Sequence, residues 1–362
     1  MKLALLGDMA FFGKCSLATN PNAEDYFAEV ANCLEKADYV VGNLETPFSV
    51  KKEIYGAKSA YLCSDVVNVE LLKYLHVDAV TLANNHMFDY GREGYETTKR
   101  VLTENSIGFF GAEGKGLDLD FEDNKLSFEG FCCYTANPIQ TVPYGEYGIN
   151  EYNYVVADKL LTKHEAEGRL TILAVHAGLE HINYPSLDHV RIARKFASNH
   201  NYVYYGHHPH VSQGLEFNNK SLLAYSLGNF CFDDIWSTND KNSPQIEMTE
   251  NNRSTFILEV TIEQNIMKGY SVIPVYIGKD RMTIGKGTTE EMLEQYTDFI
   301  KLTSENEYNK ERNQILNKRI QERKDLRNLQ WYLKRLRPRY LKLIIDGRRN
   351  KEKYIKNIKQ YI

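Results

Sequence analysis

The residues most able to do chemistry in this chain stand at the ends of predicted strands. Five apolar runs that we predict to be strands are each followed by carboxylate, amide or imidazole side chains, in the order Asp8, Asn43 with Glu45, Asn85 with His86, His176, and His207 with His208 and His210. Ligands of α/β sheets bind outside the carboxyl ends of the strands, so these groups are expected to converge. Carboxylate, amide oxygen and imidazole together suit Mn²⁺, Fe or Zn²⁺ better than Ca²⁺, which prefers oxygen ligands. The pattern predicts a divalent metal site.

Each group alone has a structural explanation that competes with metal binding. Asp8 fits a helix cap or turn, Glu45 a solvated turn before Pro47, and Asn85-His86 a turn in left-handed backbone. His176 follows an apolar run and fits a hydrogen-bonded core histidine. Three histidines within the four positions 207–210 have few structural uses, and they favour metal or phosphate binding.

The elements that must position these groups alternate between strand and helix. Apolar runs predict strands at 3–6, 39–41, 78–82, 108–111, 170–175, 202–205 and 221–225, and amphipathic stretches predict helices at 22–36, 65–75, 91–105, 153–167 and 187–199. We expect a hairpin over 124–135 and an antiparallel pair over 255–262 and 268–276. Strand–helix alternation followed by antiparallel strands predicts an α/β layered sandwich with mixed sheets.

Composition narrows the class of protein further. The 362 residues are 43% hydrophobic and 25% charged, as in ordinary globular proteins. Asp8 interrupts the N-terminal apolar stretch too early for a signal peptide, and no run is long enough for a transmembrane helix. The six cysteines form no C-x-x-C pair, and we interpret them as reduced, buried thiols. We therefore expect a cytoplasmic protein.

The net charge of −4 conceals two oppositely charged regions. Residues 310–362 contain 18 Lys and Arg against 5 Asp and Glu, a net of +13, whereas residues 1–309 have a net of −17. A leucine stripe at 326, 329, 333 and 336 predicts an amphipathic helix that Pro338 ends or kinks, and Ile355, Ile358 and Ile362 predict a second one. Three interpretations stay open: a helical appendage packed on the acidic body, a surface for anionic lipid, and a site for an anionic polymer or nucleic acid. No zinc-finger or RNP-type pattern indicates a specific nucleic acid.

The ordered motifs carry a resemblance to a known family. They are Gly7-Asp8, GNLE at 42–45, ANNH at 83–86 with DYG at 89–91, HAGLE at 176–180, GHHPHV at 206–211 and YSLGNFCFD at 225–233. This set resembles the CapA family of capsule and poly-γ-glutamate biosynthesis proteins, a branch of the calcineurin-like metallophosphoesterase superfamily. The resemblance implies a four-layer α/β/β/α sandwich, which we assign to residues 1–303, and the charge pattern adds a basic helical tail over 310–362.

The resemblance also implies roles for individual residues. Asp8 and His210 would bind a first metal, Glu45 would bridge two metals, and Asn85, His176 and His208 would bind a second. His86 would protonate the leaving oxygen, and Glu180 would be a supporting or substrate-facing acid. One or two divalent ions would serve as cofactors, and the substrate would be a cell-surface polymer or its phosphorylated precursor.

Two positions depart from the superfamily pattern. Met9 and Ala10 follow Asp8 where the common pattern is Asp-x-His, and Glu45 stands where the bridging acid is usually Asp. The first metal site is therefore expected to be poorer than the second. Two functions remain in contention: a metal-dependent hydrolase of the phosphoesterase type in capsule or exopolymer synthesis, and a non-catalytic metal-binding scaffold of that machinery, docked to an anionic membrane or a polymer through its tail.

Overall fold

Two β-sheets packed face to face form the centre of the molecule. The computed structural model describes residues 1–50, 53–56, 58, 60–237, 240–302, 304–325 and 338–361. In this part of the chain the first sheet has the order β18 (Met282–Ile284), β17 (Ile266–Ile277), β16 (Ser254–Glu263), β1 (Lys2–Met9), β2 (Tyr39–Leu44), β3 (Ala79–Thr81) and β4 (Gly108–Phe110), with β13 (Asn229–Cys231) also paired to β1. The second has the order β11 (Leu215–Asn218), β12 (Ser221–Ala224), β10 (Tyr202–His207), β9 (Leu170–His176), β6 (Asn124–Cys132) and β5 (Leu117–Phe121). Both sheets mix parallel and antiparallel pairs.

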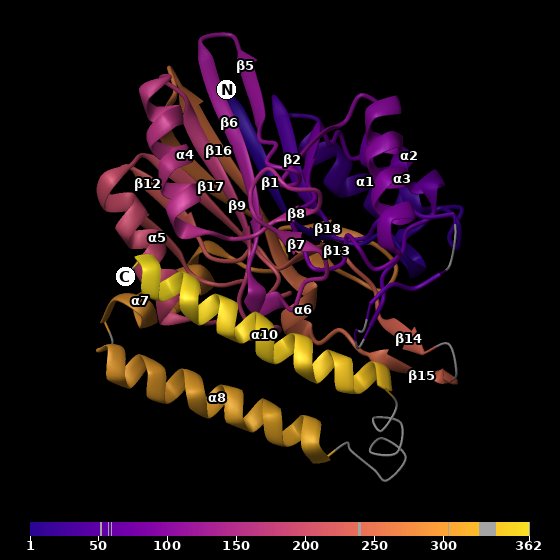
Figure 1. The fold of residues 1–362 in the computed structure, drawn as a ribbon. Coiled ribbons are helices and arrows are strands. Elements are labelled where there is room, and N and C mark those ends of the chain that lie inside the picture. Colours follow the sequence, from indigo (N-terminus) through magenta and orange to yellow (C-terminus); the bar gives the residue numbers. More distant parts are fainter. Residues whose placement is uncertain are drawn as a thin grey trace.

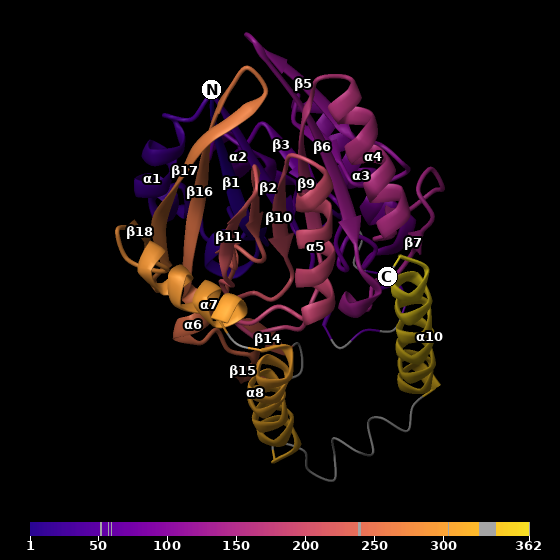
Figure 2. The ribbon, with the colours of Figure 1, turned by 90° about the vertical axis from the view of Figure 1, so that its left-hand side faces the viewer.

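Helices cover the outer face of each sheet. On one side lie α1 (Ala23–Leu34), α2 (Val69–Tyr74) and α3 (Gly91–Glu104), and on the other lie α4 (Tyr154–Ala166) and α5 (Leu187–Asn199), as Figures 1 and 2 show. Apolar side chains such as Leu5, Phe128 and Val203 fill the space between the sheets, and separate clusters fill the space under each helical layer. The four-layer α/β/β/α arrangement expected from the resemblance is confirmed. Because both faces of the central strands are covered, β1 and β9 are almost continuously apolar.

Smaller elements connect and extend the sandwich. They are the strand pairs β7 (Thr141–Val142) with β8 (Ile149–Asn150) and β14 (Ile235–Ser237) with β15 (Asp240–Ile246), the short helix α6 (Glu250–Arg253), and the later helices α7 (Glu290–Leu302), α8 (Glu305–Asp325) and α10 (Pro338–Tyr361). The predicted hairpin over 124–135 is wrong, because 124–132 is one strand, β6, and its hairpin partner is the preceding β5. The turn Glu122-Asp123 joins them, and the alternation of apolar and acidic residues in β5 is the pattern of a strand with one exposed face.

The basic C-terminal region is helical where the structure describes it. The predicted leucine stripe at 326–336 lies outside the described residues, as does Ile362. Pro338 begins α10, where its missing N–H costs nothing in a first turn, and the helix expected to end before it lies outside the described residues. Tyr354, Ile358 and Tyr361 of α10 pack against the cluster under α4 and α5, and the Asn357 side chain donates a hydrogen bond to the Tyr152 carbonyl. Helix α10 is thus attached to the acidic body (Figures 1 and 2).

A buried carboxyl group in the second sheet makes the stability of this fold sensitive to pH. Burial raises the pKa of Glu129 on β6 from 4.5 to about 7, against a hydrogen bond from the Tyr144 hydroxyl. A pKa above that of the unfolded chain means that folding favours the protonated form. Its contribution to stability is complete below pH 4.5 and is lost as the pH rises to about 7.

We expect the Glu129→Gln variant to remove this dependence. At pH 8 the variant should be about 1–3 kcal/mol more stable than the wild type. Each unit of the Glu129 pKa shift corresponds to about 1.4 kcal/mol of destabilisation, which the variant avoids, but burying the glutamine amide cancels part of this gain in stability. Near pH 5 the two proteins should be about equal. Urea unfolding at both pH values measures the difference, and parallel stability–pH curves for the two chains would contradict the prediction.

Candidate metal centre

Strand pairing brings the predicted site residues to one edge of the two sheets. In the first sheet Asp8 at the end of β1 is in register with Asn43 of β2 and Asn229 of β13. In the second sheet His176 at the end of β9 is in register with His207 of β10. Parallel strands end on the same side, so residues up to about two hundred positions apart in sequence become neighbours.

Two glycines allow the backbone to come close at this edge. A Cβ atom at Gly7, just before Asp8, would lie 2.1 Å from the Gly228 carbonyl oxygen. A Cβ atom at Gly206, just before His207, would lie 1.9 Å from the Tyr225 carbonyl oxygen. Both positions therefore require glycine for the following side chain to reach the site.

The turn that carries the histidine triplet has an unusual backbone. His208 and His210 adopt φ angles of 94° and 56°, a region that non-glycine residues rarely occupy. Such residues cost about 1–3 kcal/mol each and cluster at functional sites. The strain is compensated by contacts: the His208 N–H donates to an Asp8 oxygen at 3.2 Å, and Asn252 donates to the His210 carbonyl at 2.8 Å.

Asp8 lies in the middle of the site and is fully buried. It accepts a hydrogen bond from the Asn43 amide at 2.8 Å, and its oxygens lie 3.1 Å from His207 Nδ1 and 3.3 Å from His210 Nδ1. Burial acts to raise the pKa of Asp8, but the hydrogen bonds with His207 and His210 hold it well below the ordinary 3.8. Asp8 is thus an anion at neutral pH.

The second group of predicted ligands is equally close. His176 Nε2 lies 2.8 Å from Asn85 Oδ1 and 3.1 Å from His208 Nδ1. Burial lowers the pKa of His176 well below its usual value and that of His208 to about 4. Both imidazoles are therefore neutral at pH 7, which is the form that binds metals.

Glu45 joins the two groups. Its carboxylate lies 3.8 Å from His176 Nε2 and 3.7 Å from His210 Nε2, and ligand atoms of Glu45, His208 and His210 come within 4.8 Å of one another. Both Glu45 oxygens are buried and accept no hydrogen bond in the described structure. Burial and the Asp8 charge raise the pKa of Glu45 well above 4.5. A buried carboxylate without hydrogen-bond donors is costly unless a cation compensates it, so these residues fit a divalent metal ion.

His210 shows how the site balances its charge without a cation. Burial acts to lower its pKa, but Glu45 and Asp8 raise it to about 10. At neutral pH a proton on His210 therefore stands between two carboxyl groups. Metal binding requires the neutral imidazole and would release this proton.

His86 occupies a separate position beside the ligands. Its Nδ1 lies 2.6 Å from an Asp89 oxygen, which leaves Nε2 as the nitrogen that can exchange a proton with a bound substrate. Burial lowers the pKa of His86, and Asp89 opposes that change. An imidazole held in this way is suited to general acid–base chemistry.

The structure adds residues that the sequence did not single out. Lys58 is buried, and its Nζ lies 2.7 Å from Asp89 Oδ1, 2.7 Å from the Asn85 carbonyl and 2.9 Å from His86 Nδ1. Asn229, within the quoted SLGNF motif, holds His210 Nδ1 through its Oδ1 at 2.9 Å. Glu180 is the exposed member of the predicted set, with 40% of its side chain accessible, and its charge still raises the pKa values of Glu45 and His210.

Comparison with known proteins agrees with this geometry. The family model for "Bacterial capsule synthesis protein PGA_cap" matches residues 2–234, the segment that supplies every residue of the site except Asn252. The chain belongs to this family.

Two curated relatives support the PGA_cap assignment and confirm the resemblance to CapA proteins. "Capsule biosynthesis protein CapA" of Bacillus anthracis is 28% identical over 306 residues, which cover 80% of this chain and 73% of that protein. "PGA biosynthesis protein CapA" of Bacillus subtilis (strain 168) is 28% identical over 250 residues, which cover 66% of this chain and 64% of that protein. This PGA_cap chain thus spans a little under two thirds of the second relative.

Solved structures with similar folds are distant from this PGA_cap chain. A 5'-nucleotidase from Candida albicans SC5314 has a TM-score of 0.44 at 12% identity, covering 90% of this chain and 57% of that one. A putative 5'-nucleotidase from Staphylococcus aureus has a TM-score of 0.42 at 10% identity, covering 83% of this chain and 59% of that one. The family assignment therefore rests on the family model and the two CapA relatives.

Proposed function

We propose that this protein is a metal-dependent hydrolase of the phosphoesterase type that acts in the synthesis or export of a capsule or related cell-surface polymer. The observation that carries the chemistry is the convergence of three buried histidines, His176, His208 and His210, on Glu45, whose oxygens accept no hydrogen bond from the described residues. The pathway follows from the relatives, which are described as capsule and PGA biosynthesis proteins. The substrate would be the polymer or its phosphorylated precursor.

The proposed roles divide between holding metal and moving a proton. Asp8, Glu45 and His210 would hold one divalent ion, and Asn85, His176 and His208 a second that shares Glu45. A bound Mn²⁺, Fe or Zn²⁺ would supply positive charge that polarises a phosphoester. His86, fixed by Asp89 at 2.6 Å, would donate its proton to the leaving oxygen. Glu180, at the accessible rim, would face the substrate.

The test is hydrolysis of bis(p-nitrophenyl) phosphate and p-nitrophenyl phosphate. We expect activity with Mn²⁺, loss of activity with EDTA, and a fall of at least about 10²-fold in His176→Ala, as expected when a metal ligand is removed. His200→Gln is the matched control, because His200 pairs with Asp158 and Glu165 at the far end of α5. Stoichiometric metal binding without turnover on either ester would support the scaffold alternative instead.

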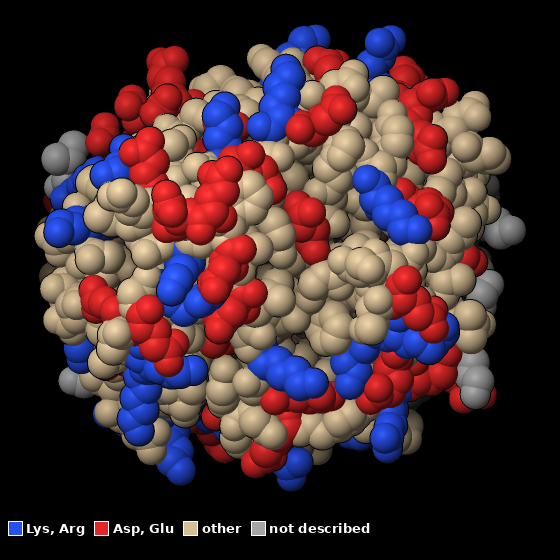
Figure 3. Space-filling view, turned by 90° about the horizontal axis from the view of Figure 1, so that it is seen from above, with Lys and Arg blue, Asp and Glu red and all other residues tan. Residues whose placement is uncertain are grey.

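A specific observation favours docking of this protein to an anionic membrane. Among the helices in the described ranges, none is long and apolar enough to cross a bilayer. On α10, however, Leu341, Ile344 and Ile345 are 54%, 48% and 50% exposed, on the face opposite Asn357 and Tyr361, which contact the body. Lys and Arg surround this face within the tail of net charge +13. The other end of the molecule, in Figure 3, shows both signs of charge interspersed.

We expect the Leu341→Ser/Ile344→Ser/Ile345→Ser variant to lose binding to anionic vesicles. Vesicles with roughly one third phosphatidylglycerol should sediment the wild type, and the triple variant should bind about tenfold or more weakly, because burial of apolar side chains and charge attraction act together. Phe217→Ser/Ile266→Ser removes residues that are 55% and 52% exposed on the body and should have little effect. Equal sedimentation of all three proteins would contradict membrane docking through α10.

A further inference from the structure

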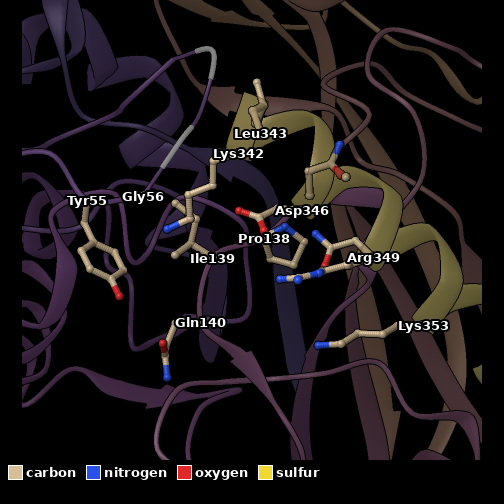
Figure 4. A pocket seen from close by; sticks show the side chains of 13 residues that line it. Tyr55, Gly56, Pro138, Ile139, Gln140, Lys342, Leu343, Asp346, Arg349 and Lys353 are labelled. Carbon is tan, nitrogen blue, oxygen red and sulfur yellow. The ribbon is translucent and has the colours of Figure 1, made fainter. Parts of the chain in front are cut away.

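A pocket of about 310 Å³ separates α10 from the body of the protein. Its body side consists of Tyr55, Gly56 and residues 137–140, and its other side is the face of α10 between Lys342 and Lys353 (Figure 4). None of the residues to which we give a role at the metal centre lines it. It is therefore a separate cavity.

Both body segments that line the pocket are fastened to the metal centre. The Tyr55 N–H donates to the Asp89 carbonyl at 2.7 Å, and Asp89 in turn holds His86. The Cys133 N–H, just before the helical turn that leads to Asn137, donates to the His176 carbonyl at 2.9 Å. In Figure 1 the strand β1 runs from the N-terminus toward the end of the molecule where α10 lies, so the metal edge and the pocket face the same end.

The helix contributes a row of charged side chains to the pocket. Lys342, Asp346, Arg349 and Lys353 are spaced by four, three and four residues, which places them on one face of α10. Figure 4 shows the Lys342, Arg349 and Lys353 side chains extending from α10 into the space between helix and body. Lys353 Nζ also lies 4.9 Å from the ring centroid of Tyr134, which stands outside the pocket lining. The row carries three cations against one carboxylate.

Gly347 keeps the pocket open where the helix passes the body. It lines the pocket, and a Cβ atom there would lie 3.8 Å from Asn137 Oδ1, an ordinary contact. Glycine inside a helix costs about 0.5–1 kcal/mol relative to alanine, so this position is not optimised for helix stability. A longer side chain at this position would extend into the cavity.

We propose that this pocket binds an anionic group, a phosphate or a carboxylate, of a ligand that also reaches the metal edge. A guanidinium group and two ammonium groups facing one cavity match the oxygens of either anion. The anion site follows from the pocket itself. Its connection with the metal edge rests on the proposed function.

Calorimetric titration of the full chain with tripolyphosphate and with citrate tests the site. The protein is first stripped of metal with EDTA, so that binding does not depend on the metal centre. Salt is held at about 0.15 M, where charges more than about 8 Å apart are largely screened. We expect Lys342→Gln/Arg349→Gln/Lys353→Gln to weaken binding at least about tenfold, the effect of losing several charge-assisted hydrogen bonds. The tighter of the two probes identifies phosphate or carboxylate as the preferred group.

A matched variant separates the pocket from the general charge of the helix. Arg348→Gln/Lys351→Gln/Lys359→Gln also removes one guanidinium and two ammonium groups, but from positions of α10 that do not line the pocket, and it should change affinity by about twofold at most under that screening. Equal weakening by both triple variants, or no binding by the wild type, would overturn the proposal.

Three further substitutions, at Asp346 and Gly347, guard against a folding defect. Asp346→Asn removes the carboxylate of the charged row and should strengthen anion binding severalfold, which misfolding could not cause. Gly347→Leu should extend into the pocket and weaken binding severalfold, whereas Gly347→Ala should keep it. Unchanged affinity in both Asp346→Asn and Gly347→Leu would overturn the site. Selective anion binding by a protein without esterase activity would leave the pocket in place and remove the proposed hydrolase.

Discussion

Substitution of His86 by alanine is expected to lower Mn²⁺-dependent hydrolysis by about 10²- to 10⁴-fold, the usual contribution of a positioned general acid. The reason is geometric: Asp89 holds Nδ1 at 2.6 Å, so Nε2 is the nitrogen that can give up a proton. Affinity for Mn²⁺ should change little, because His86 is beside the ligand set rather than in it. A loss of hydrolysis without a loss of metal assigns the residue to chemistry.

A substitution of Lys58 offers a second test of His86 as the general acid, because it should shift the pH dependence of the rate. Burial lowers the pKa of His86, and the Lys58 charge lowers it further. Lys58→Met should therefore raise the pKa of His86 and move the alkaline limb of the rate–pH curve upward, because the acid stays protonated to a higher pH. His200→Gln should match the wild type in rate and profile. An unchanged rate in His86→Ala would remove this histidine from the mechanism.

Substitution of Glu45 by glutamine is expected to have opposite effects on metal binding and on stability. Affinity for Mn²⁺ should fall by at least about 100-fold. In the proposed two-metal site Glu45 is the negatively charged ligand that both ions share, and glutamine lacks that charge. The metal-free protein should nevertheless be at least as stable as the wild type. Burial and Asp8 already raise the pKa of Glu45, which means that its charge opposes folding until a cation arrives.

Calorimetry and thermal unfolding in EDTA measure the two effects separately. Because His210 has a pKa of about 10 without metal, binding to the wild type at pH 7 should also release protons, seen as a heat that depends on the buffer. Metal affinity should accordingly increase as the pH rises from 7 toward the His210 pKa of about 10. Glu129→Gln removes another buried carboxyl group and should keep metal affinity within about twofold, since additivity holds for distant sites. Destabilisation of the metal-free Glu45→Gln protein would contradict the assignment.

Much of the fold could be predicted because local pattern and burial agree. The runs before Asp8, His176 and His207 are apolar because they lie at the centres of covered sheets, and α1, α3 and α5 show an apolar stripe for the same reason. The carboxylate, amide and imidazole side chains that follow the strands were also predictable from the sequence. Parallel strands of one sheet end at the same edge, so residues at their carboxyl ends come together in space.

Other features depend on contacts that no local pattern encodes. Lys58 reaches His86 from a segment 28 residues earlier, and it looks in sequence like any surface lysine. His207 ends β10 and turns toward Asp8, while its neighbour His208 turns toward His176, and only the backbone angles of the turn decide this. The pocket under α10 depends on where a helix packs, and in sequence its charged row looks like the other cations of the helix.

The antiparallel pairing of β1 with β16 has a consequence for how this protein is made. Leu3 is paired with Val260, and the Met1 amino group donates to the Ile262 carbonyl, so during synthesis β1 waits for a strand that begins only at Ser254. The family-matching segment ends at residue 234, before β16 begins at Ser254. During translation, therefore, the strand that carries Asp8 has an open edge until about residue 263 has emerged, and such edges are prone to pair with other chains. All the proposed metal ligands, of which His210 is the last, precede β16, so this edge of β1 closes only after every one of them has been made.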